Sequence, residues 1–225
     1  MKLSEAIKLT DDIVRDNANK LANTQDADGL TASSTTALGL AFSTHSQYSP
    51  KRISQSIACG ENGMILTSAI NNFDEGFFPW VKIEFPIIPI GPPSWLDRTS
   101  FKLDVVDIGE VIRFIETIPG PGLLVRIVHC VGHVLPKDDT VDFTIRPSDG
   151  NALCHLAAAF KLQMLADFYG QTTNKPVGAA DGSLSVFGTL SGQYMKLAAL
   201  ERGIYAAHMQ AVYERSAIGQ RLVRG

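Results

Sequence analysis

Apolar positions follow a helical spacing near both ends of the chain and a strand-like spacing in the middle. Between about residues 53 and 146, short runs of branched and aromatic residues alternate with glycine- and proline-containing turns, as in successive β-strands. The strand candidates are ISQSIAC, MILTSAI, WVKIEF, SFKLDVV, VIRFIET, LLVRIVHCVGHV and VDFTI. No helical pattern interrupts them, so we expect an antiparallel sheet, a sandwich or a small barrel.

Two segments within this β-rich zone have special roles. The DIGE sequence lies between two strand candidates and predicts a tight hairpin turn. The segment FPIIPIGPPSW carries four prolines, which cannot donate backbone hydrogen bonds to a central ladder. We therefore expect an edge segment or an extended arm there.

The first zone, residues 1–52, predicts two helices. An amphipathic helix is expected over residues 3–21, and a second carries TASSTTALGLAFSTHSQ after a cap at Asp26 or Asp28. Pro50 disfavours helical geometry at the residue before it. The second helix should therefore stop before Tyr48.

The third zone predicts two further helices joined by a glycine-rich linker. The segment NALCHLAAAFKLQMLADFYG has the spacing of a helix with one buried stripe, made of Leu153, Leu156, Ala157, Phe160, Met164 and Phe168. Ser148 or Asp149 can cap its start, and Gly170 can end it in a left-handed conformation. A longer closing helix is expected from about residue 185 to residue 213.

These patterns predict an α+β fold with N-terminal helices, a central antiparallel β block and two C-terminal helices, the last one long. We expect residues 1–52 and 147–217 to form a helical bundle domain. Residues 53–146 would be an inserted β-rich domain, and residues 218–225 a flexible C-terminal docking tail.

Composition and charge narrow the function classes only slightly. The 225 residues carry a net charge of −3, which gives no general attraction to nucleic acid. Three scattered cysteines favour a reducing compartment over a disulfide framework. We find neither a signal peptide nor an apolar run long enough to span a membrane, so we expect a soluble protein made in the cytoplasm.

Candidate catalytic and metal-binding groups each have a simpler structural explanation. His129 and His133, placed on one strand, would lie about 13 Å apart, too far to share a metal ion. Cys154 and His155 begin a helix, where a thiol can be activated, but adjacent helical residues point about 100° apart. We therefore predict no catalytic, cofactor-binding or metal-binding residues and a non-enzymatic protein.

Acidic and aromatic clusters have simpler structural explanations as well. Asp11–Asp12, Asp26 with Asp28, and Asp138–Asp139 each lie in a turn or at a helix start, where capping accounts for them. Aromatic residues bracket the proline-rich segment, but only Lys82 and Arg98 lie near them in the sequence. A stacking platform for nucleic acid needs more cations, so packing in a core or an interface is favoured.

The order of features resembles the tailed-bacteriophage neck proteins that act as head-to-tail adaptors or head-completion proteins. The resemblance rests on a helix ending in STHSQYSPKR, a mid-chain IEFPI with its proline-containing arm, the helix NALCHLAAAFKLQMLADFYG, a linker with Asp181, and the closing helix QYMKLAALERGIYAAHM. It covers residues 28 to 213. No catalytic signature takes part in it.

This resemblance implies a structural virion protein of the phage neck, assembled in the host cytoplasm. Such adaptors form a ring, typically of twelve copies, beneath the portal protein and above a tail, stopper or nozzle protein, and DNA passes through the lumen. The closing helix and tail enter portal grooves. Mapped here, the docking residues would be Tyr213, Arg215, Ile218, Arg221, Leu222, Val223 and Arg224.

Other readings remain open at the level of sequence. The tail ERSAIGQRLVRG is either a frayed terminus or a segment that orders in a partner's groove. A tail terminator or stopper ring protein is the nearest alternative function. An enzyme using Cys154 or the histidine pair, and a cellular β-sandwich binding module, are the alternatives from other classes. No cofactor and no membrane partner are expected.

Overall fold

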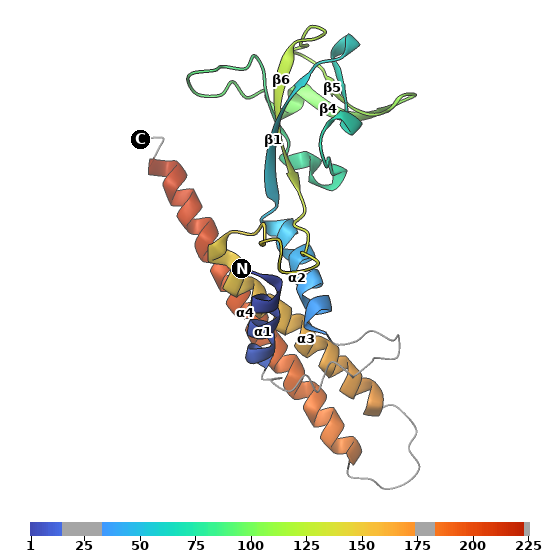
Figure 1. Ribbon diagram of the computed structural model, residues 1–225, viewed down its shortest axis with the longest axis vertical. Coiled ribbons are helices and arrows are strands. Elements are labelled where there is room, and N and C mark those ends of the chain that lie inside the picture. Colours follow the sequence, from blue (N-terminus) through green and yellow to red (C-terminus); the bar gives the residue numbers. More distant parts are fainter. Residues whose placement is uncertain (15–32, 174–182, 223–225) are drawn as a thin grey trace. The chain divides into compact units, whose positions relative to one another are not determined.

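A computed structural model describes the backbone of residues 1–14, 33–173 and 183–222, and the side chains of residues 1–14, 33–171 and 189–214. The predicted α+β class is confirmed: N-terminal helices, two antiparallel three-stranded sheets, and C-terminal helices that include a long closing one (Figure 1). The chain forms two compact units. We call residues 1–48 with 133–225 the helical unit and residues 49–132 the β unit.

The β unit ends at residue 132, whereas the sequence analysis placed its end at residue 146. Residues 133–146 belong to the helical unit because Phe143 and Ile145 are buried in the helical core. The backbone N–H of Phe143 also donates to the carbonyl of Met1, at 3.2 Å. The strand predicted at VDFTI is therefore wrong, since its apolar side chains serve the core of a helix bundle and no sheet.

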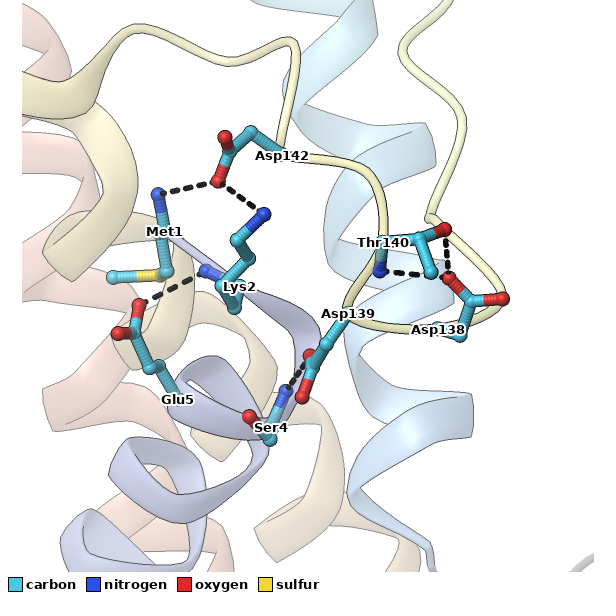
Figure 2. A network of polar contacts seen from close by, with 8 residues as sticks. All are labelled: Met1, Lys2, Ser4, Glu5, Asp138, Asp139, Thr140 and Asp142. Atoms are coloured by element: carbon cyan, nitrogen blue, oxygen red, sulfur yellow. Dashed lines mark hydrogen bonds and ion pairs between the residues drawn. The ribbon is translucent and has the colours of Figure 1, made fainter.

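A polar network fastens this returning segment to the start of the chain (Figure 2). Asp142 lies 3.2 Å from the Lys2 ammonium, and Asp139 accepts a 2.8 Å hydrogen bond from the backbone N–H of Ser4. Asp138 accepts from the backbone N–H of Thr140, at 2.8 Å. The adjacent acids Asp138 and Asp139 thus cap a turn and a helix start, and these hydrogen bonds lower the pKa of both carboxyl groups.

In its described residues, the helical unit has four α-helices: α1 (Leu3–Val14), α2 (Ser34–Tyr48), α3 (Gly150–Thr173) and α4 (Ser183–Leu222). α2 begins after Ser33, whose hydroxyl accepts from the backbone N–H of Thr36, at 3.1 Å, in the manner of an N-cap. Asp26 and Asp28, the predicted caps, lie outside the described residues, as do residues 15–21 of the first predicted helix.

α3 is surrounded by the other three helices, so the prediction of a single buried stripe is wrong. Leu162 and Leu165, which lie off that stripe, are buried as well, together with most of the alanines between residues 152 and 166. Even Lys161 is fully buried, with its ammonium 2.7 Å from the Asp11 carboxylate. Because small residues lie on all sides of α3, several helices can pack against it. An apolar spacing that is tested for one face only does not reveal this.

Gly170 does not end α3, which continues to Thr173. A Cβ atom at Gly170 would lie 3.4 Å from the Ser191 hydroxyl of α4, so the glycine lies where two helices approach closely. α4 is longer than predicted at both ends and runs for 40 residues. Residues 218–222, which we expected in a flexible tail, therefore have a helical backbone.

The β unit consists of two antiparallel sheets, ordered β1-β6-β3 and β2-β5-β4. The strands are β1 (Lys51–Ala58), β2 (Met64–Leu66), β3 (Lys82–Glu84), β4 (Phe101–Val106), β5 (Gly109–Phe114) and β6 (Leu124–Val131). Residues of both sheets, among them Ile83, Ile112 and Ile127, share one buried core. The predicted DIGE hairpin joins β4 to β5, and its Gly109 has a φ of 122°, which favours glycine.

The proline-rich segment lies at a sheet edge, as expected. It leaves β3 at Phe85 and returns beside it, where Glu84 and Trp95 form a single bridge. The Leu96 N–H donates to the Ile83 carbonyl, at 2.8 Å. Ile90 in the intervening loop is 93% exposed, so the segment adds no strand to the middle of a ladder.

Candidate interaction surfaces on the closing helix

α4 packs on the rest of the helical unit along a narrow seam. Its partly or fully buried positions include Tyr194, Ala198, Glu201, Tyr205 and His208, which recur at spacings of four and three residues. Alternating spacings of four and three residues are typical of a helix that packs along another helix over several turns. The remaining sides of α4 carry exposed residues, so α4 is held by only a small part of its circumference.

Three polar contacts fix the register of α4 on this seam. The Tyr205 hydroxyl lies 3.0 Å from Nδ1 of His45 on α2. His208 Nε2 lies 3.0 Å from Oδ1 of Asp149, just before α3. The third contact joins His155 of α3 to Glu201, at 2.6 Å. Because polar groups in such surroundings are costly to leave unpaired, each contact specifies where α4 must lie.

Burial controls the ionisation of these groups. Removal from water lowers the pKa of His45 to about 4, because the charged imidazolium loses its solvation. Burial likewise raises the pKa of the Tyr205 hydroxyl. Burial alone would raise the pKa of Asp149. The hydrogen bonds from His208 and Ser148 and the neighbouring histidines outweigh this effect, so the pKa of Asp149 is lowered. The second carboxylate oxygen of Asp149 is buried without a hydrogen bond.

The candidate chemical groups of the sequence lie apart from one another. The Cys154 thiol is fully buried, and desolvation raises its pKa to about 11, so it stays protonated at neutral pH. His155 pairs with Glu201. His129 is buried in β6, near the Asn71 carbonyl, whereas His133 follows the end of β6 and belongs to the helical unit. The described residues include no group of three or more potential metal-binding side chains.

One flank of α4 carries an exposed apolar stripe. Leu197, Leu200 and Ile204 are 46%, 60% and 40% exposed, and their spacing of three and four residues puts them on one side of the helix. Large aliphatic side chains grouped on a surface are typical of a contact with another protein. We call these three residues the stripe.

Another flank of α4 borders an apolar groove of about 400 Å³. α2, α3 and α4 contribute its lining: Thr44, Tyr48, Leu156, Phe160, Arg202, Tyr205, Ala206 and Met209. The Arg202 guanidinium lies 5.4 Å from the centre of the Phe160 ring, so the only charge in the lining is drawn over an aromatic face. We call this hollow the groove.

The stripe and the groove face different directions. At about 100° of rotation per residue, the stripe and the α4 residues of the groove lie on the order of 150° apart around the helix. The helical unit therefore presents two separate apolar surfaces on nearly opposite sides of one helix.

The predicted docking residues lie at or beyond the end of this arrangement. Tyr213 is 76% exposed and follows Ala206 by seven residues, which places it on the groove side of α4. Arg215, Ile218, Arg221 and Leu222 lie on the helical backbone, but their side chains are outside the described residues. Val223 and Arg224 are outside them altogether.

Neither the stripe nor the groove was predicted from the sequence. One signal was present: the apolar residues between 194 and 209 do not fit a single stripe, because Leu197, Leu200 and Ile204 are offset from Tyr194, Ala198 and Tyr205. A helix with two apolar sides needs two partners. The groove had no such signal, because α2, α3 and α4 form it together.

Comparison with known proteins gives no match: neither a protein-family model nor a curated protein is similar to this chain. Among the helices that the structure describes, none is both long and apolar enough to cross a bilayer.

Proposed function

We propose that this protein is a structural ring subunit of a tailed-phage neck, a head-to-tail adaptor that links the portal to the tail. The observation that carries the proposal is the pair of apolar surfaces on opposite flanks of α4. Leu200 in the stripe and Tyr48 at the groove are each at least 60% exposed, although burial in water-free contacts would stabilise them by roughly 25 cal/mol per Å².

Two different surfaces on one subunit suit a closed ring. In a head-to-tail contact, the stripe of one copy occupies the groove of the next. The same contact repeats between successive copies until the ring closes. A two-fold dimer would need only one self-complementary surface. The resemblance described above points to twelve copies.

The free end of α4 would then serve the portal. α4 continues beyond the seam that holds it, and its last turns carry Arg215, Ile218, Arg221 and Leu222. With Val223 and Arg224 they form a mixed basic and apolar segment that could enter a groove as a helix. The net charge of −3 suits a lumen through which DNA passes without being held.

Paired substitutions test the head-to-tail contact. Leu200→Glu places a charge in the stripe, and Ala206→Glu places one in the groove; both side chains are exposed, so the subunit should still fold. Each variant alone should fail to form rings in native mass spectrometry. Mixed together, they should form dimers, because each variant keeps the surface that the other has lost.

Gln210→Lys is the matched control, since residue 210 is exposed on α4 and belongs to neither surface. It should assemble like the wild type. Variants that assemble normally, or a mixture that gives no dimer although the wild type forms rings, would contradict stripe-in-groove assembly.

A further inference from the structure

The β unit has a pocket of about 310 Å³ on the β1-β6-β3 sheet, lined by Arg52, Pro79, Trp80, Lys82, Val128 and Cys130. Strand register explains how residues thirty positions apart meet there. Arg52 of β1 is paired with Cys130 of β6, and Lys82 of β3 is paired with Val128 of the same central strand. Two cations from the two outer strands thus flank one hollow.

The positive charge of this pocket is not neutralised by the described residues. Neither Arg52 nor Lys82 forms an ion pair with an acidic side chain in the described part of the chain, whereas Arg126 on the same sheet pairs with Glu84, at 2.7 Å. Two unpaired cations around one concave surface attract an anion.

One tryptophan lines the pocket, and a second lies beside Lys82. Trp80 lines it and is 44% exposed. Trp95 is 41% exposed, and the Lys82 ammonium lies 6.0 Å from the centre of its ring. An exposed indole face next to cations is the arrangement on which nucleobases stack while their phosphates are bound.

We propose that this pocket binds a nucleotide unit, with the phosphate at Arg52 and Lys82 and the base on Trp80. A carboxylate ligand would use the cations and leave the indole face in water, and an apolar segment would cover the cations without pairing them. The nucleotide unit can belong to a single strand of nucleic acid or be free. This inference is independent of the adaptor function.

Tryptophan fluorescence provides a direct test, because the chain has only two tryptophans: Trp80 lines the pocket, and Trp95 lies beside the pocket residue Lys82. Titration of the full-length protein with oligo(dT) at low salt should quench the fluorescence. The logarithm of the apparent Kd should rise with the logarithm of the salt concentration with a slope near +1.4, as expected for about two phosphate contacts on a single strand. A parallel titration with dTMP separates the two sources: equal affinity identifies a free nucleotide, and much weaker affinity identifies a strand.

Variants locate the binding. Arg52→Gln and Lys82→Gln should each raise the Kd at least about tenfold, and Trp80→Ala should do so while Trp95 continues to report. The matched control is Lys102→Gln on β4, which removes one exposed cation of the same unit and should leave the Kd unchanged. Circular dichroism checks that each variant is folded.

Three results would overturn the proposal. The first is no quenching by either ligand at low salt. The second is an equal loss of affinity in Lys102→Gln, which would mean unspecific attraction. The third is binding of poly-glutamate as tight as that of oligo(dT), which would make the pocket a general acceptor of acidic peptides.

Discussion

His45 shows how single residues fix the position of the closing helix. Its ring is buried on α2 and lies 3.0 Å from the Tyr205 hydroxyl of α4. The neutral ring can form this hydrogen bond, whereas a protonated ring would carry its charge in a buried site that destabilises it. The attachment of α4 is therefore sensitive to pH through one side chain.

We predict that the helical unit loses stability in mild acid because of His45. The unfolded chain takes up a proton near pH 6.5, but the folded protein does so only near pH 4. The unfolded state therefore binds more protons in this window, and the free energy of unfolding falls as the pH drops, by on the order of 3 kcal/mol in full. His45→Gln should flatten this dependence, measured by urea unfolding followed by circular dichroism.

The tryptophans supply an internal control for this experiment. Trp80 and Trp95 belong to the β unit, so their fluorescence follows that unit and should respond equally in wild type and variant. The lowered pKa of Asp149 also reduces stability in acid; the variant keeps the hydrogen bonds from His208 and Ser148 that lower it and loses only the contribution of His45. Equal slopes of helical stability against pH in the two proteins would refute the assignment to His45.

At the level of elements, local patterns predicted most of the fold. Short apolar runs predicted all six strands in the part of the chain that the structure describes, and the DIGE turn predicted the β4–β5 hairpin. VDFTI failed because its apolar side chains pack on helices instead of a sheet, and sequence periodicity carries no information about the partner. α3 failed as a one-stripe helix for the same reason, since its neighbours were unknown.

The interaction surfaces were less accessible to sequence analysis than the elements. Recognising the stripe requires knowing which side of α4 packs on the rest of the helical unit. Predicting the pocket at Trp80 requires the strand register that places Arg52 and Lys82 on the two sides of one hollow. Both depend on contacts between residues far apart in the chain, which no local pattern encodes.

Gly170 provides a test of the corrected boundary of α3. Inside a helix, Gly170→Ala should stabilise the protein by about 0.5 to 1 kcal/mol, because alanine loses less conformational entropy on folding. The added Cβ would lie 3.4 Å from the Ser191 hydroxyl, an ordinary contact. Had Gly170 ended the helix in a left-handed conformation, the same change would destabilise it.

Urea unfolding measures this effect. Gly109→Ala is the contrasting control, because Gly109 has a φ of 122° and alanine would be strained there. The account requires opposite signs for the two substitutions. A destabilised Gly170→Ala protein would mean that α3 ends before this residue.

At the scale of the whole molecule, two compact units carry separate surfaces. The helical unit has the stripe and the groove on opposite flanks of α4, and the β unit has the basic pocket at Trp80. A protein built as one member of a ring uses several surfaces at once, for its two neighbours and for the proteins above and below. This division of labour is what the adaptor proposal demands.

The most direct test of the adaptor proposal is quantitative mass spectrometry of purified virions of a tailed phage that carries this sequence, with copies counted relative to the portal protein. The adaptor proposal predicts nearly equal numbers, because each subunit of a stacked ring would meet one portal subunit. About half as many copies would indicate a six-fold tail component instead. Absence from the particle would contradict the structural role.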